Sequence, residues 1–283
     1  MLIKNARMGE RLVDLRLSEQ IEAIEPVLEV KPGEEELDAR GCEVLSGFHD
    51  HHLHFFASLA KDNSVPCGPP LTADLEALKF RLRAFPSPGR WIRGFGYHES
   101  VAGEIDRFSL DLIVRDRPIR VQHRTGKMWI LNTCACEELE LARYVHLKGV
   151  ETNKDGSPTG RLYRMDAWLR ERTETVNQEA VGRYSEKLLG MGITSFTDAS
   201  YTNNSKSLSY YRRVRAAGEL KQKIDLMGDE SLGTGFLKVM LDEDRFPVLD
   251  ELVLRIKKAH DSGRGVAFHC VTHLELLFAL ESL

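Results

Sequence analysis

Histidines are concentrated in one short segment, GFHDHHLHF, which runs from Gly47 to Phe55 and holds four of them in six residues. His52 and His54 stand two positions apart, and on a β-strand that spacing sends both side chains from the same face. Neutral imidazole is a common ligand for zinc, iron and nickel. Asp50 falls on the same alternation and adds a carboxylate. The segment predicts half of a metal site, against the alternative of a histidine-rich polar loop.

Other potential ligands are assigned lesser roles. His49 and His51 fall on the opposite alternation from His52 and His54, which predicts packing or a role behind the ligands. The pair Cys134 and Cys136 could bind a soft metal, but two thiols make an incomplete site. We therefore expect ordinary structural cysteines there, with a metal-handling or redox protein as the alternative reading.

The elements that position the histidines change in character along the chain. Residues 1–45 contain Leu12–Leu17 and Ile21–Ile24, which alternate apolar and polar residues as half-buried strands do. From residue 46 onward, apolar strands alternate with segments of helical spacing. The predicted strands are 118–123, 193–198, 235–241 and 265–271, and the predicted helices are 178–190, 205–217 and 249–262. This alternation predicts an α/β fold with a parallel sheet covered by helices, after a small β-layer.

Composition excludes several classes of protein. The chain has 283 residues, 42% of them hydrophobic and 29% charged, with a net charge of −4. Such a balance gives no reason to expect a nucleic-acid or anionic-membrane partner. The N-terminus is charged throughout and lacks the apolar core of a signal peptide, and the five cysteines have no framework spacing. We therefore expect a cytoplasmic location with free thiols.

Five segments, in order, resemble a known family. They are Asp38 to His54, the run HRTGKMWILN from His123, the run DGSPTGRL from Asp155, GITS from Gly192, and VAFH ending at His269. Together they resemble the amidohydrolase superfamily, and most closely its family 3 of metal-dependent hydrolases. The resemblance spans nearly the whole chain, which makes it far more specific than an isolated pair of histidines.

The resemblance implies a (β/α)8 TIM-type barrel with a small β-sandwich that is built partly from residues 1–45, the barrel occupying residues 46–283. It implies one or two divalent metals, zinc first, with iron, manganese or nickel as alternatives. The implied metal ligands are His52, His54, an N-carboxylated Lys238 and His269. The implied catalytic residues are His123 and His269. The implied substrate-binding residues are His123, Trp129, Asn132 and Arg161.

Lys238 has a chemical rationale of its own. Its neighbours Phe236, Leu237, Val239 and Met240 are apolar, which predicts burial on a central strand. Burial lowers the pKa of an amine, and a neutral amine can take up carbon dioxide to form a carbamate ligand. The residues alone leave this reading level with a lysine that reaches out to water. The resemblance favours the ligand role.

The sequence departs from the family at two places. Ser46 stands where the opening motif usually has proline, a change that concerns only a turn. The chain also stops at Leu283, after about the fifth of eight barrel strands, before the family's sixth-strand histidine and eighth-strand aspartate. We expect a fragment of a longer protein, with a natural partial barrel completed by a partner or a second copy as the alternative.

The predicted activity is hydrolysis of an amide or cyclic amide-like C–N bond by metal-activated water. The expected partner is a small-molecule substrate, together with a homodimer on base rates and no nucleic acid or membrane. The competing hypothesis is a non-catalytic partial barrel that serves as a metal-binding or interaction module.

Overall fold

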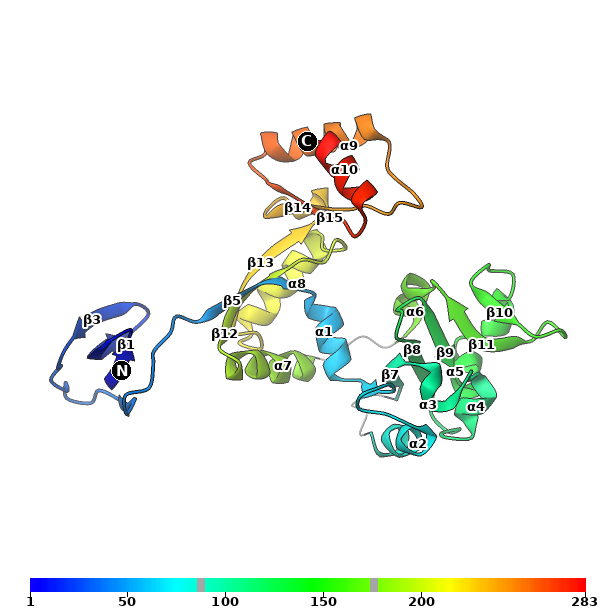
Figure 1. Cartoon of the computed structure of the whole chain (residues 1–283), viewed down its shortest axis with the longest axis horizontal. Helices are drawn as coiled ribbons and strands as arrows, with labels where there is room; N and C mark the ends of the chain where they lie inside the picture. Colours follow the sequence, from blue (N-terminus) through cyan, green and yellow to red (C-terminus); the bar gives the residue numbers. More distant parts are fainter. Residues whose placement is uncertain (86–89, 174–177) are drawn as a thin grey trace.

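The computed structural model describes residues 1–85, 90–173 and 178–283. Three sheets divide these residues into lobes (Figure 1): an N-terminal sheet, a central parallel sheet that continues to the C-terminus, and a mixed sheet. In the sequence, the mixed sheet lies between the first and second strands of the central sheet. Within these ranges, no helix combines the length and apolar character needed to span a bilayer.

The N-terminal sheet has four strands in the order β3-β2-β1-β4. The strands are β1 Leu2–Met8, β2 Arg11–Leu17, β3 Ile21–Glu25 and β4 Glu36–Asp38. Ala6, Val13 and Leu15 form its small buried core. The strands predicted near 12–17 and 21–24 are confirmed. The sandwich that the resemblance implies stays a prediction, since the described residues of this lobe form one sheet.

The central sheet is parallel and has five strands in the order β15-β14-β13-β12-β5. Its strands are β5 Phe48–Leu53, β12 Ile193–Asp198, β13 Lys223–Gly228, β14 Phe236–Met240 and β15 Val266–His269. The sheet curls and makes about half of a TIM-type barrel. A parallel α/β fold with five barrel strands is thereby confirmed.

Helices cover one face of this sheet. They are α1 Phe55–Asp62, α7 Gln178–Gly190, α8 Ser205–Ala216, α9 Leu249–Asp261 and α10 His273–Glu281. The rings of Phe55 and Phe196 stack with centroids 5.2 Å apart, and Tyr211 packs against both. Full burial of each such ring contributes roughly 1.5–3 kcal/mol. We call the opposite face of the sheet its inner face.

The mixed sheet lies between α1 and α7 in the sequence and has six strands in the order β10-β11-β9-β8-β7-β6. The strands are β6 Val65–Pro66, β7 Ile92–Tyr97, β8 Ile119–His123, β9 Met128–Leu131, β10 Val150–Thr152 and β11 Pro158–Tyr163. Its helices are α2 Leu75–Ala84, α3 Glu99–Ala102, α4 Arg107–Asp111, α5 Thr133–Glu138 and α6 Asp166–Arg172. Two buried apolar clusters, separate from those of the parallel sheet, hold this lobe together.

The sequence analysis placed one strand in the wrong sheet and missed another. The strand at 118–123 is real, but as β8 it belongs to the mixed sheet and not to the parallel barrel. The barrel strand β13, Lys223–Gly228, was missed because its mixture of lysine, aspartate and apolar residues lacks the continuous apolar run of its neighbours. The two errors cancel in the strand count.

Candidate active site

A β-bulge in β5 sets the direction of the histidines. Asp50 is paired with Phe196 and Leu53 with Asp198, so three steps along β5 match two along β12. An extra residue of this kind shifts the alternation of side chains by one position. Leu53 packs into the helix-covered core, which directs its neighbours His52 and His54 to the inner face.

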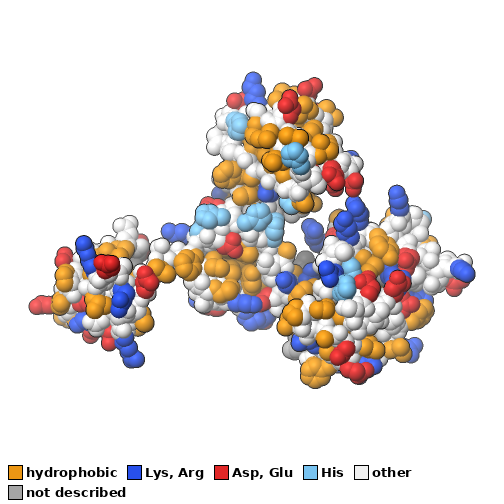
Figure 2. Space-filling view, viewed as in Figure 1, with side chains coloured by type: hydrophobic (Ala, Val, Ile, Leu, Met, Phe, Trp, Pro, Cys, Tyr) orange, Lys and Arg blue, Asp and Glu red, His pale blue; other side chains and the backbone are white. Residues whose placement is uncertain are grey.

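The bulge corrects one prediction. His49 also faces inward, because its ring contacts the side chains of Ser195 and Thr197, which alternate with the core residue Phe196. The His51 ring lies 4.4 Å from that of His49, centroid to centroid. The four histidines therefore gather on one side of the strand, and Figure 2 shows histidines side by side on the central lobe. The separation expected from strict alternation is wrong.

His49 supports the site without offering a ligand. Its Nδ1 lies 2.8 Å from Ser195 Oγ and its Nε2 lies 2.8 Å from Thr197 Oγ1. Both ring nitrogens are therefore engaged, one as a donor and the other as an acceptor, which leaves no lone pair for a metal. This geometry agrees with the supporting role predicted for His49.

His54 is held by a chain of hydrogen bonds that begins in the buried core. Its Nδ1 lies 3.1 Å from Ser200 Oγ, and the Ser200 backbone N–H donates to Asp198 Oδ1 over 2.9 Å. Asp198 is fully buried and accepts a 2.5 Å hydrogen bond from the Tyr211 hydroxyl. Fixing Nδ1 in this way orients the ring and leaves Nε2 for a metal, the usual arrangement behind metal-bound histidine.

Electrostatics link His54 to the other predicted ligands. Desolvation lowers the pKa of His54, and the neighbouring His52 lowers it further, while Asp198 opposes both. Charges on Lys238 and His269 act in the same direction as His52. The His52 and His54 rings lie 5.1 Å apart, centroid to centroid, nearly perpendicular to each other. The lowered pKa keeps His54 in the neutral form that binds metals.

Lys238 is buried on the inner side of β14. Its neighbours Leu237 and Val239 pack toward α9, so Lys238 points the other way, and only 7% of it is exposed. Burial lowers the pKa of its amine, and the charge of the Cys270 thiol group opposes this shift. His269 on β15 is paired with Met240, which lies two residues after Lys238 on the same face of β14. His269 therefore lies on the same face of the sheet as Lys238.

These groups share a face without forming a closed ligand shell. Across the described ranges, no three His, Cys, Asp or Glu side chains lie close enough together to hold a metal ion. The pair His52 and His54 is therefore the part of the site that the structure brings together directly. The set of four ligands stays a prediction.

The predicted substrate residues lie in the mixed-sheet lobe, and three of them are occupied by contacts within it. Asn132 is fully buried, and its amide makes four hydrogen bonds to backbone groups, of Ile119, Ala135, Val114 and Arg117. The Trp129 indole N–H donates to Asp166 over 2.8 Å. The Arg161 Nε donates to a backbone carbonyl over 2.8 Å. The structure thus gives Asn132 a structural role, because its amide has no hydrogen-bond donor or acceptor left for a substrate.

His123 lies at the end of β8 with a partner that the sequence analysis missed. Its Nε2 lies 3.1 Å from Glu99 Oε1, and its Nδ1 lies 2.9 Å from Thr125 Oγ1. The backbone N–H of Glu99 itself, and then His123, lowers the pKa of the Glu99 carboxyl. The sequence did contain a signal for this pair. Glu99 lies just after β7, and His123 is the last residue of β8. The C-terminal ends of neighbouring parallel strands meet at one edge of a sheet.

Comparison with known proteins identifies the family. The model of the Amidohydrolase family matches residues 35–282. The chain belongs to the amidohydrolase family. It is 31% identical over 208 residues to an N-substituted formamide deformylase of Arthrobacter pascens, an alignment that covers 67% of this chain and 38% of that protein. The alignment with this amidohydrolase thus spans well under two thirds of the length of that relative.

Two solved structures share its fold. Both are described as uncharacterized metal-dependent hydrolases. The one from Pyrococcus horikoshii OT3 has a TM-score of 0.66 and 22% identity, over 89% of this chain and 58% of that chain. The one from Pyrococcus furiosus has a TM-score of 0.71 and 20% identity, over 99% of this chain and 69% of that chain. At these identities the likeness concerns the fold alone.

Proposed function

We propose that the full-length protein is a metal-dependent hydrolase that cleaves an amide or cyclic amide-like C–N bond. The observation that carries this proposal is the inward-facing pair His52 and His54, with His54 Nδ1 tied to Ser200, on the same face as the buried Lys238. Membership of the amidohydrolase family and the formamide deformylase relative support it.

The chemistry of the proposed donors suits a divalent metal. His52, His54 and His269 would supply imidazole nitrogens, which suit zinc, iron and nickel, while a carbamate on Lys238 would supply oxygens. Zinc is our first choice, with one or two ions. When bound, the metal supplies Lewis acidity that makes water a nucleophile near neutral pH.

The residues of the chain have definable tasks in this scheme. Ser200 and Asp198 hold the His54 ring in place through the hydrogen bonds described above. The neutral Lys238 amine would add to carbon dioxide, forming an N–C bond and releasing one proton to water. His123, paired with Glu99, is the proposed group that carries a proton, and its Nδ1 would exchange the Thr125 hydroxyl for the substrate. Trp129 and Arg161, in the same lobe, are proposed to bind the substrate beside His123.

The test combines metal analysis with hydrolysis of N-substituted formamides and simple cyclic amides. The full-length protein, expressed with zinc, should contain about one to two equivalents of metal and release amine or open the ring. His54→Asn should lower kcat/KM more than about 100-fold, since even residues behind metal ligands cost 10–100-fold. His260→Asn, an exposed histidine on α9, is the matched control and should act like the parent.

The competing hypothesis makes different predictions. A non-catalytic metal-binding module would bind metal without hydrolysing either substrate class. Less than about 0.2 equivalents of any divalent metal after supplementation would refute the metal-dependent mechanism itself. The homodimer and the cytoplasmic location are further proposals, open to sedimentation analysis and cell fractionation.

A further inference from the structure

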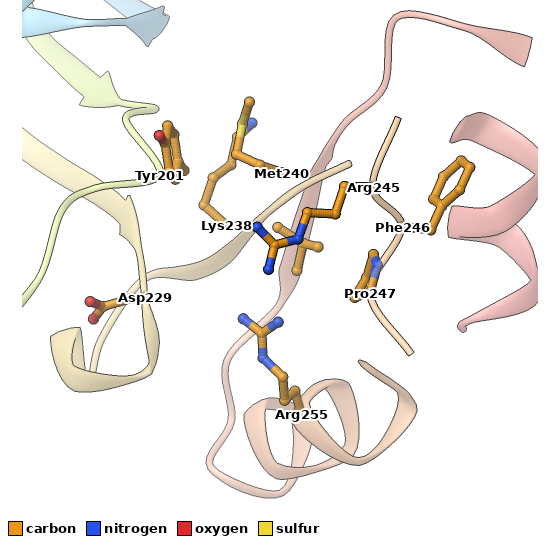
Figure 3. Close-up of a pocket in the computed structure, with 9 residues that line it drawn as sticks. Tyr201, Asp229, Lys238, Met240, Arg245, Phe246, Pro247 and Arg255 are labelled. Carbon is orange, nitrogen blue, oxygen red and sulfur yellow. The ribbon is translucent and has the colours of Figure 1, made fainter. Parts of the chain in front are cut away.

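A cavity of about 430 Å³ opens beside Lys238, bounded by the ends of β13 and β14, the segment before α9, and α9 itself. Figure 3 shows the residues that line it. Tyr201, Met240, Phe246 and Pro247 make part of its wall apolar. Its volume is that of a small-molecule site, which typically combines apolar walls with a few polar groups.

Two arginines project into this cavity from different segments. The guanidinium ends of Arg245 and Arg255 point toward each other in Figure 3. Arg255 Nε is paired with Glu230 Oε1 at 2.5 Å. Within the described parts of the chain, no carboxylate forms an ion pair with Arg245. Glu230 compensates the charge of Arg255, whereas the charge of Arg245 has no such partner, and an anion in the cavity would balance it.

Two carboxylates near the cavity have contacts that do not involve Arg245. Asp229 lines the cavity, but its Oδ1 accepts hydrogen bonds from the Ser231 backbone N–H and hydroxyl over 2.8 and 2.7 Å. The acidic run at residues 242–244 precedes Arg245, where the Asp242 carboxylate accepts from the Asp244 backbone. Neither contact involves the Arg245 guanidinium, and among the described residues no ion pair ties it up, so it is available to a ligand.

We propose that this cavity binds an oxyanion group of the substrate, a carboxylate or a phosphate, between Arg245 and Arg255. The planar guanidinium presents paired N–H donors that match such groups. The apolar wall at Phe246 and Pro247 would hold the rest of the molecule. This inference rests on the proposed function, because Lys238 lines the cavity and would also hold the metal.

The test measures binding to the metal-loaded full-length protein by isothermal titration calorimetry. The probes are 3-phenylpropionate, phenyl phosphate and 3-phenylpropanol, which contain no C–N bond. At least one of the two oxyanions should bind about tenfold or more tightly than the alcohol, and the tighter of the two identifies the group. Arg245→Gln should remove about tenfold of that affinity, and Arg245→Lys should restore part of it.

The controls separate this site from other sources of affinity. Any binding of the oxyanion to the metal cancels between the parent and Arg245→Gln. Arg183→Gln removes the same charge from an exposed position on α7 and should leave binding unchanged. Equal affinity for the alcohol and both oxyanions, or an equal loss in Arg183→Gln, would overturn the inference. Selective oxyanion binding without hydrolysis would count against the proposed function alone.

Discussion

Removal of the Ser200 hydroxyl should weaken metal binding without unfolding the protein. Ser200 connects the buried Asp198 to His54, whose Nδ1 lies 3.1 Å from the serine Oγ. In Ser200→Ala the ring of His54 would lose the contact that fixes its orientation and tautomer. Metal binding would then have to fix the orientation of the ring, and that cost would lower the affinity for the metal.

The expected size of the effect follows from the position of this bond. Residues behind metal-bound histidines typically contribute 10–100-fold to metal affinity. By the relation of about 1.4 kcal/mol per tenfold, this is about 1.4–2.8 kcal/mol of binding free energy. The bond to His54 is exposed to solvent, so its loss should lower the free energy of unfolding by less than about 1 kcal/mol.

Zinc affinity of the full-length protein can be measured by competition with a chromophoric chelator, together with urea unfolding of the metal-free form. Ser209→Ala is the matched control, because Ser209 is an exposed serine whose hydroxyl donates to a backbone carbonyl on α8 over 3.0 Å. The reasoning is refuted if Ser200→Ala keeps its zinc affinity within twofold, or if both variants lose it equally.

Three further changes test the fold. Asn132→Ala should lower the free energy of unfolding by at least about 2 kcal/mol and leave KM unchanged, because the four hydrogen bonds of its amide all go to backbone groups. A raised KM at unchanged stability would restore the predicted role of Asn132 in substrate binding. Phe196→Ala should lower the free energy of unfolding in urea by about 3–5 kcal/mol. Phe80, which is 73% exposed, is the control, and Phe80→Ala should lower it by less than about 0.5 kcal/mol. Equal losses would contradict the assigned core. Glu34 is hydrogen-bonded by Arg16, which lowers its pKa from 4.5 to about 2, so its stabilisation is present above pH 4.5 and is lost as the pH falls toward 2. The Tm of Glu34→Gln should therefore fall less than that of the parent between pH 5 and 3, and parallel curves would exclude this contribution.

The sequence by itself determined the family, the parallel α/β class and the helices of the half-barrel. The helix predicted at 178–190 is found unchanged as α7, and those at 205–217 and 249–262 each end one residue earlier. These features depend on local periodicity and on ordered motifs, which are properties of neighbouring residues.

Tertiary structure decided which sheet each strand joined and where the side chains point. The run 118–123 has the pattern of a barrel strand, yet its pairing with β7 and β9 places it in the mixed sheet. The bulge in β5 exists only in the pairing with β12, and it brings His49 to the same face as His54. The sequence motif predicts that Asn132 contacts the substrate, whereas the structure shows its amide bonded to four backbone groups. Strand partners and bond partners distant in the sequence are set by the packing of the whole chain, and no local pattern encodes them.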